Sequence, residues 1–212
     1  FMGALSTTLV IFLLAYMADS SRTTIILAGI TVSSFLSAGI NTIKLLDTDI
    51  TINLTTFMIG SLSGITFDHL KYPAAAIVTA LLLSFFLTEP LNILGLGDDI
   101  ARSLGLNVTS VRLILLVLSS VLSGCVVSYA GLLSFVGLIV PHICRRLFGN
   151  DARYLLPCSA LLGACFVLTC DILGRVVFAP FELPAGVLMS FVGGPFFLYL
   201  LFKKKGGRRV NA

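Results

Sequence analysis

Charged residues are scarce in this sequence. Asp, Glu, Lys and Arg make up 11% of its 212 residues, against about 25% in typical soluble domains. Hydrophobic residues make up 57%. So little charge cannot cover a water-exposed surface of this size. The composition therefore excludes an ordinary cytosolic enzyme, a disordered chain and a nucleic-acid-binding protein. It favours an all-α polytopic membrane protein, in which each crossing needs roughly 20 apolar residues.

Several motifs that carry chemistry are also missing. The chain contains no G-x-x-x-x-G-K-[ST] sequence, so we expect no phosphate-binding loop for ATP in this chain. Its five cysteines include no C-x-x-C pair, and we interpret them as small buried hydrophobic residues. No basic segment precedes the first apolar run, which starts at Phe1. We therefore interpret the sequence as a chain that lacks its natural start.

Charges and helix-breaking residues divide the chain into seven apolar segments that we expect to cross a membrane. These segments lie at residues 1–18, 23–43, 73–87 (extendable to 94), 113–130, 132–143, 154–177 and 183–202. A shorter apolar piece at residues 54–65 is too short to cross, and it is predicted to be a surface or re-entrant helix.

Basic residues are distributed unequally between the two sides that these segments define. Three of the fourteen, Lys44, Lys71 and Arg175, fall on one side and eleven on the other. Short cytoplasmic loops carry an excess of Lys and Arg. The C-terminus and the connectors at 95–112 and 144–153 are therefore predicted to be cytoplasmic. The eleven basic residues on that side are Arg22, Arg102, Arg112, Arg145, Arg146, Arg153, Lys203, Lys204, Lys205, Arg208 and Arg209.

A polar connector at residues 94–106 is predicted to hold a short helix at the cytoplasmic surface. Asp98 and Asp99 suit a helix N-terminus, where carboxylates meet unpaired N–H groups. Gly105 suits the C-terminal end. The residues alone leave two interpretations open: an ordinary loop element, or a projection that fits a cleft on a soluble partner.

The same connector carries a resemblance to a known family. Its D-I-A-x-x-x-G segment, Asp99 to Gly105, resembles the E-A-A-x-x-x-G loop of ABC-importer permeases, with Asp for Glu and Ile for the first Ala. The sequence G-L-L-S-F-V-G-L-I-V-P-H at 131–142 is similar to the G-x-x-x-F-V-G-L-x-x-P-H motif of permeases for iron–siderophore, haem and cobalamin complexes. Four further motifs occur in that family's order: L-L-P at 155–157, D-I-L-G-R at 171–175, E-L-P-A-G at 182–186 and G-G-P-F-F at 193–197.

The resemblance covers the whole chain and implies a FecCD-type permease. The expected fold has about seven of the family's ten transmembrane helices, with short coupling and outer gating helices, in one domain over residues 1–212 that is incomplete at its N-terminus. The implied function is a transport subunit, not an enzyme, in the plasma membrane of a bacterium or archaeon. It would import an iron–siderophore, haem or cobalamin complex by alternating access.

The family also implies partners. These are two ATPase subunits that bind ATP and Mg²⁺, a second permease subunit in a homodimer or heterodimer, an extracytoplasmic substrate-binding protein and the lipid bilayer. No nucleic acid is expected, and the chain itself is expected to bind no cofactor or metal.

The resemblance assigns roles to two groups of residues and to Arg175. In the connector helix, small Ala101 and Gly105 are expected to allow close approach to the ATPase. The residues expected to couple the chain to the ATPase are Asp98, Asp99, Ala101, Arg102 and Gly105. The residues expected at the gate or along the path are Phe57, Met58, Gly60, Gly64, Ser37 and Asn41.

Two of these assignments have a structural alternative. Gly60-x-x-x-Gly64 would serve tight packing as readily as hinge-like movement. Asp171 and Arg175, four residues apart, would form an internal ion pair on one helix face. The resemblance instead implies that Arg175 receives a carboxylate of the substrate-binding protein at the outer mouth.

Two other functions fit the sequence less well. A secondary transporter needs mid-membrane carboxylates, and only Asp171 qualifies, with Arg175 available to neutralise it. An intramembrane hydrolase needs a Ser–His or paired-Asp arrangement at a suitable depth. The G-S-L-S-G segment at 60–64 lacks the G-x-S-x-G register. The importer permease is therefore the favoured function.

Overall fold

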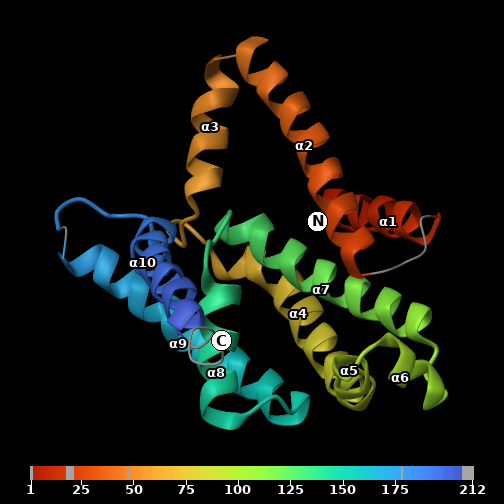
Figure 1. Ribbon diagram of the computed structural model, residues 1–212. Helices are drawn as coiled ribbons and strands as arrows, with labels where there is room; N and C mark the ends of the chain where they lie inside the picture. Colours follow the sequence, from red (N-terminus) through yellow and green to blue (C-terminus); the bar gives the residue numbers. More distant parts are fainter. Residues whose placement is uncertain (1, 18–21, 47, 178, 207–212) are drawn as a thin grey trace. The chain divides into compact units, whose positions relative to one another are not determined.

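The computed structural model describes residues 2–17, 22–46, 48–177 and 179–206 (Figure 1). These residues form ten α-helices and no strand, which confirms the all-α prediction. The chain divides into two compact units. The first comprises Phe1–Thr55 and Ile65–Tyr129, and the second comprises Thr56–Gly64 and Ala130–Ala212. The boundary between the units therefore falls inside α3 (Thr48–Ile59).

The first unit contains most of α3 together with six other helices. They are α1 (Met2–Met17), α2 (Arg22–Leu46), α4 (Phe67–Phe86), α5 (Thr88–Gly95), α6 (Asp98–Ser103) and α7 (Val108–Ala130). Helix α1 packs against α2, and α5 packs against both α4 and α6. A small apolar core forms where α5, α6 and α7 meet, around Leu94, Ala101 and Val108.

The second unit is built from α8 (Val136–Phe148), α9 (Ala152–Val177) and α10 (Ala185–Gly206). Each of these three helices packs against the other two (Figure 1). Its core is centred on Cys170, Ala185 and Met189. The end of α3 and the loop that follows it belong to this unit.

The predicted segment at 73–87, extendable to 94, is a bent pair of helices. Helices α4 and α5 meet at an angle of 59°. Pro90 lies in the first turn of α5. Because proline has no N–H and its ring excludes a carbonyl four residues earlier, a straight helix cannot continue through Phe86 to Pro90. The bend therefore follows from the sequence T-E-P.

Within the described part of the chain, three helices are long and apolar enough to cross a membrane: Thr23–Leu46 in α2, α7 and α9. The α4–α5 pair is a fourth if it counts as one span. This supports a multi-pass membrane protein. The other three predicted crossings fall on α1, with 16 residues, on α8 and on α10, whose apolar part is Ala185–Leu200. Helix α8 has 13 residues, which is roughly 20 Å at 1.5 Å per residue, against a hydrocarbon core of roughly 30 Å. The count of seven stays a prediction.

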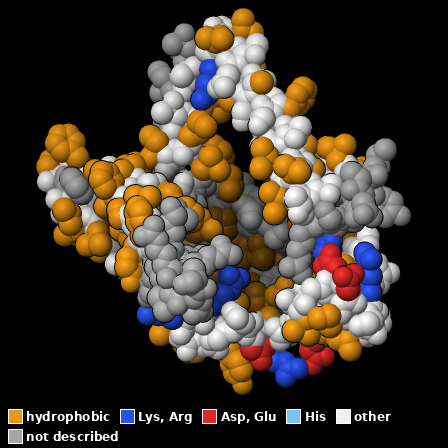
Figure 2. All heavy atoms as spheres, in the orientation of Figure 1, with side chains coloured by type: hydrophobic (Ala, Val, Ile, Leu, Met, Phe, Trp, Pro, Cys, Tyr) orange, Lys and Arg blue, Asp and Glu red, His pale blue; other side chains and the backbone are white. Residues whose placement is uncertain are grey.

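The helices expose much apolar surface. Figure 2 shows hydrophobic side chains on the outer surfaces of the helices. None of the residues in the apolar window of α2 is buried within this chain. Because large apolar surfaces of this kind are not stable in water, lipid or another subunit has to cover them.

Candidate functional site

Helix α6 is folded back onto its neighbours. It begins after Gly97, whose carbonyl accepts a hydrogen bond from Ala101 N–H at 3.0 Å. Ala101 is fully buried, and it packs with Leu94 and Val108. A larger side chain at this position would push α6 away from α5 and α7. The small residue thus serves the packing of the chain itself.

An ion pair holds the start of α6. The guanidinium Nη2 of Arg112 in α7 donates to both carboxylate oxygens of Asp98, at 2.9 and 2.8 Å. Both side chains are largely buried, with exposed fractions of 13% for Arg112 and 26% for Asp98. Asp98 lies in the first turn of α6. Its carboxylate therefore fixes α6 to α7, an interaction that the sequence did not predict.

The end of α6 is a Schellman motif. Gly105 N–H donates to the carbonyl of Arg102, and Leu106 N–H donates to the carbonyl of Ala101, both at 3.0 Å. Gly105 has a φ of +82°, and a Cβ there would meet no atom within 4 Å. The glycine is needed for its backbone conformation, as predicted for a helix stop. Close packing is not the reason for it.

The outer face of α6 combines charge with apolar side chains. Asp99 and Arg102 are exposed. Beside them, Leu96, Ile100 and Leu104 are 61%, 49% and 61% exposed. We call these five residues the α6 outer face. Sequence reasoning missed its apolar members, although the four-residue spacing of Ile100 and Leu104 was the signal that could have found them.

The structure separates the five residues predicted to couple the chain to the ATPase. Asp99, Arg102 and Gly105 are exposed. Asp98 is occupied by Arg112, and Ala101 is buried in the core. In this structure the Ala101 side chain packs against α5 and α7, and the close approach of Ala101 and Gly105 to a partner cleft stays a prediction. Whether the helix couples to an ATPase stays a prediction.

A second group of residues forms where the end of α3, the turn before α8 and the start of α10 meet. Three hydrogen bonds between backbone groups join these segments. They run from Leu132 N–H to the Phe57 carbonyl (3.2 Å), from Ser61 N–H to the Ala130 carbonyl (2.9 Å) and from Gly186 N–H to the Gly60 carbonyl (3.1 Å). We call these six residues, with Gly131, the glycine junction.

Glycine is required at each close approach in the junction. A Cβ on Gly60 would lie 2.6 Å from the carbonyl oxygen of Leu132, and one on Gly131 would collide with the carbonyl oxygen of Phe57. Both glycines also have positive φ values, +73° and +68°, which residues with a side chain rarely adopt. A Cβ on Gly186 would collide with backbone in the same way.

This geometry corrects the prediction for residues 54–65. Helix α3 occupies residues 48–59 and ends at Ile59. Gly60 and Gly64 lie beyond it with φ values of +73° and +80°, so G-x-x-x-G is not a helical packing motif here. Gly60 nevertheless packs tightly, whereas Gly64 has open space around it. Phe57 and Met58, the other predicted gating residues in this segment, are 43% and 50% exposed.

The end of α9 carries the predicted docking arginine. Arg175 Nε donates to Asp171 Oδ2 at 2.9 Å, and its Nη2 donates to Oδ1 at 3.5 Å. The Arg175 side chain remains 43% exposed, and that of Asp171 is 20% exposed. The internal ion pair is therefore confirmed. It orients the guanidinium and leaves part of it open to a second partner.

Two of the family-like motifs meet at this point. Leu183 N–H donates to the carbonyl of Gly174 at 3.2 Å, and a Cβ on Gly174 would lie 2.5 Å from the Leu183 carbonyl oxygen. D-I-L-G-R and E-L-P-A-G are thus joined through their backbones. Next to this contact, Glu182 Oε2 accepts a hydrogen bond from the Ser63 hydroxyl at 2.8 Å. Glu182 also places a second negative charge near Arg175.

Two other family-like motifs pack α8 against α10. Phe135 precedes α8 with a φ of +64°, and its ring occupies the space where a side chain on Gly193 would be. The ring of His142 meets that of Phe196 edge-on, with 6.2 Å between centroids and 77° between planes. The G-G-P-F-F segment therefore packs against Phe135 and His142 of the 131–142 segment.

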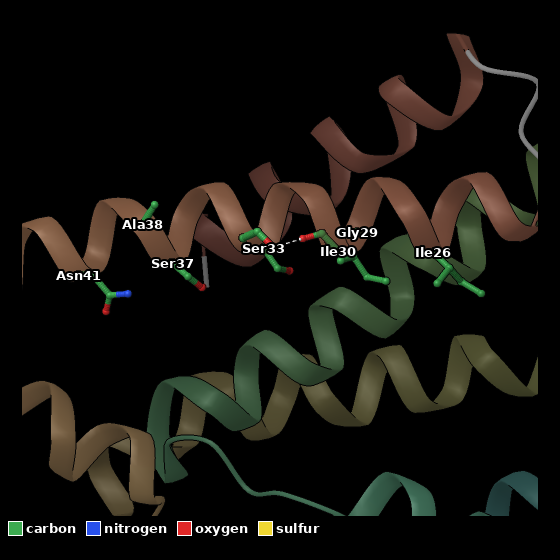
Figure 3. Close-up of a pocket in the computed structure, with 8 residues that line it drawn as sticks. Ile26, Gly29, Ile30, Ser33, Ser37, Ala38 and Asn41 are labelled. Atoms are coloured by element: carbon green, nitrogen blue, oxygen red, sulfur yellow. Dashed lines mark hydrogen bonds between the residues drawn. The ribbon is translucent and has the colours of Figure 1, made fainter.

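The polar residues of α2 line an open hollow. Figure 3 shows Ser37 and Asn41 on the same side of the helix as Ile26. The hollow has a volume of about 710 Å³, and its lining residues are Ile26, Gly29, Ile30, Ser33, Ser34, Ser37, Ala38 and Asn41. The Ser34 hydroxyl donates to the carbonyl of Ile30 in its own helix, at 2.9 Å. Ser37 and Asn41 belong to the first unit, and Phe57 to Gly64 belong to the second.

The cysteines do not form a reactive or metal-binding group. All five are free thiols, and Cys125, Cys144 and Cys170 are buried. This confirms the prediction of buried small hydrophobic residues for these three, while Cys165 is exposed. Among the described residues, no group of three or more His, Cys, Asp or Glu side chains is arranged to hold a metal ion.

Comparison with known proteins gives a consistent result. Residues 1–203 match the model of the FecCD transport family. The chain is 42% identical over 207 residues to a Bacillus subtilis protein named a probable siderophore transport system permease, YfhA, covering 97% of this chain and 60% of the relative. It is 36% identical to the hemin transport system permease HmuU of Yersinia pestis, covering 98% of this chain and 63% of the relative. The chain thus spans about three fifths of the length of these relatives.

A solved structure shares the fold. It is an ABC transporter, assigned to the metal-chelate type, in an inward-facing conformation. The TM-score is 0.83 at 27% identity, and the match covers 94% of this chain and 72% of the other.

Proposed function

The chain belongs to the FecCD transport family, and on that premise we propose that it is a permease subunit of an ABC importer. Its substrate would be an iron–siderophore, haem or cobalamin complex, carried across the plasma membrane into the cytoplasm by alternating access. The observation that carries this proposal is the family match over residues 1–203. The relatives named for siderophore and hemin transport support the substrate class.

The proposed partners on the cytoplasmic side are two ATPase subunits, which would bind ATP and Mg²⁺. We assign their contact to the α6 outer face. Exposed apolar side chains rimmed by charges are typical of a protein interface. Ile100 and Leu104 would enter a cleft of the ATPase, and Asp99 and Arg102 would set the orientation of α6 through charge complementarity. The distribution of basic residues supports a cytoplasmic position for α6 and for the C-terminus.

Rigid attachment of α6 would let it transmit movement. A shift between two conformations of the transporter requires contacts that differ between them. A connector that bends would absorb the movement of the ATPases and would not transmit it. The Asp98–Arg112 ion pair fixes one end of α6 to α7. Ala101 packs the middle, and the Schellman motif holds the other end. Movement imposed on α6 by closure of the ATPases would therefore pass to α7.

The proposed partner on the outer side is a substrate-binding protein. Arg175 would receive one of its carboxylates, because part of the guanidinium is exposed while Asp171 holds its orientation. Arginine suits this role because its planar guanidinium can bind carboxylates through two parallel bonds. A second permease subunit would cover the exposed apolar face of α2. Ser37, Asn41, Phe57 and Met58 would then lie along or beside the path at the subunit interface.

The test is ATP-driven uptake by the complete transporter in proteoliposomes. Uptake of a radiolabelled iron–siderophore complex, supplied on its cognate binding protein, should require ATP on the ATPase side. It should persist when ionophores collapse the ion gradients. Uptake that proceeds without ATP and stops with the ionophores would contradict the importer and favour a secondary transporter. Parallel assays with haem and cobalamin would identify the substrate class.

A further inference from the structure

The Ser63–Glu182 hydrogen bond joins the loop between α9 and α10 to the turn after α3. Ser63 lies in the 61–64 turn, where its own N–H donates to the Ser61 hydroxyl at 3.1 Å. Glu182 lies between α9 and α10, beside Arg175. The bond joins a hydroxyl to a carboxylate at 2.8 Å, which is an ordinary distance for an O–H···O hydrogen bond.

The backbone that follows Glu182 is held at two points. Leu183, the next residue, is bonded to Gly174, and Gly174 precedes Arg175 in α9. Gly186, four residues after Glu182, is bonded to Gly60 in the glycine junction. These backbone bonds involve glycines that no side chain can replace without displacement. The Ser63–Glu182 contact is made by two exposed side chains, so it can break while these backbone hydrogen bonds stay in place.

We propose that the Ser63–Glu182 contact senses docking of the substrate-binding protein: an incoming carboxylate at Arg175 displaces Glu182 from Ser63 and releases the 61–64 turn. This inference rests on the proposed docking role of Arg175. It adds two residues to that role: Glu182, which responds to the incoming carboxylate, and Ser63, which holds the 61–64 turn until Glu182 leaves. The partner is a protein that presents a carboxylate.

Repulsion between the carboxylates around Arg175 would displace Glu182. One guanidinium is already paired with Asp171 and lies near Glu182. A third carboxylate placed on Arg175 is repelled by both, since like charges at short range raise the free energy of the group. Asp171 is held on the same helix face as Arg175 and is only 20% exposed. Glu182 is exposed, so it is the carboxylate that can rotate into solvent.

Release of Glu182 acts on a turn that is able to move. Gly64 closes the turn with a φ of +80° and has no atom near its missing side chain. Gly60, at the other end, stays bonded to Gly186. The 61–64 turn is therefore free to change conformation at Gly64 while the glycine junction holds. Docking outside would thus alter the segment that leads into α4 without breaking the packing of α8, α9 and α10.

The experiment uses the complete transporter that contains this chain, in nanodiscs with its ATPase subunits. The dissociation constant of the substrate-loaded binding protein and the ATP hydrolysis rate with and without it are measured for each variant. Ser63→Ala removes the contact, so basal hydrolysis should rise about fivefold and stimulation by the binding protein should fall by the same factor. Glu182→Gln keeps an acceptor oxygen but loses the charge, so basal hydrolysis should stay low and stimulation should fall.

Docking should not weaken in either variant, because neither removes Arg175 and linkage is reciprocal. The double variant should match Ser63→Ala alone, since both substitutions act through one contact. The matched control is Thr169→Val in α9, which removes a hydroxyl that is bonded to the Cys165 carbonyl of its own helix. It should behave as wild type in every measurement.

Arg175→Glu separates the inference from the function on which it rests, and should weaken docking by about tenfold or more. If it does so, but Ser63→Ala and Glu182→Gln keep wild-type basal and stimulated rates, the docking role stands and the sensor is overturned. If Arg175→Glu docks normally, both the docking role and the sensor are overturned.

Discussion

The carboxylate of Asp98 receives two hydrogen bonds from the guanidinium of Arg112, fourteen residues later in the chain. This pair converts a six-residue helix, too short to be stable by itself, into a fixed projection of α7. The charges of the connector therefore divide into two groups. Asp98 and Arg112 hold the helix, and Asp99 and Arg102 face outward.

The ion pair gives a prediction about coupling. Asp98→Asn should cost about 1–3 kcal/mol of stability, because it leaves the largely buried Arg112 without its charged partner. ATP hydrolysis by the assembled transporter should continue while uptake falls, since α6 would no longer move with α7. Ser119→Ala is the matched control, because it removes from α7 only a hydroxyl that donates to the Leu116 carbonyl of its own helix. Equal uptake per ATP in Asp98→Asn and wild type would contradict the transmission of movement from α6 to α7.

The α6 outer face gives a prediction about assembly. Ile100→Ala or Leu104→Ala should weaken binding of the ATPase subunits by about tenfold, the effect of losing a well-packed interface residue. The measurement is the dissociation constant of the ATPase from the permease in nanodiscs. Leu161→Ala removes a leucine from α9 that is even more exposed than Leu104, and it should leave assembly unchanged. Loss of affinity in that control alone would place the interface elsewhere.

Two glycines near α6 make a matched pair. Gly105→Ala should destabilise the protein by about 1–2 kcal/mol, because alanine is strained at a φ of +82°. Gly95→Ala should be tolerated, since Gly95 has no positive φ and no neighbour within 4 Å of its missing Cβ. Thermal unfolding in detergent compares the two. A larger residue, as in Gly105→Val, should also uncouple uptake from hydrolysis while membrane insertion is retained.

The glycines of the glycine junction should tolerate no side chain. Gly186→Ala places a methyl group against the carbonyl of Ile59, and the backbone shift that follows should cost about 1–3 kcal/mol. Gly194→Ala, in the same helix, meets open space and should be accepted. The yield of folded permease on size-exclusion chromatography gives the comparison. Equal yields would mean that the junction can open without cost.

Much of the fold could be predicted because apolar length and charge position define membrane helices locally. The predicted segment at 154–177 lies within α9, which starts at Ala152, and that at 113–130 lies within α7. The Asp171–Arg175 ion pair followed from four-residue helical spacing alone. Predictions of this kind need no knowledge of which segments meet in space.

Sequence reasoning fell short where tertiary contacts decide the outcome. Ala101 is expected to approach a partner because alanine is small, and in this structure its small size also lets α6 pack on Leu94 and Val108. Gly60 and Gly64 have helical spacing, yet their positive φ values place them in a turn. The partner of Ser63 could not be predicted, because Glu182 is 119 residues away in the sequence.

That separation bears on how the protein is made. The end of α3 leaves the ribosome long before the E-L-P-A-G segment that binds it, so the Gly60 carbonyl cannot find Gly186 during insertion of the first unit. A contact between such distant segments forms late, after α10 has been synthesised. Until then the turn after α3 has no native partner for its backbone groups at this position. The second unit therefore lacks this contact until the start of α10 has been made, and a nascent chain halted before Gly186 should be a substrate for membrane quality control.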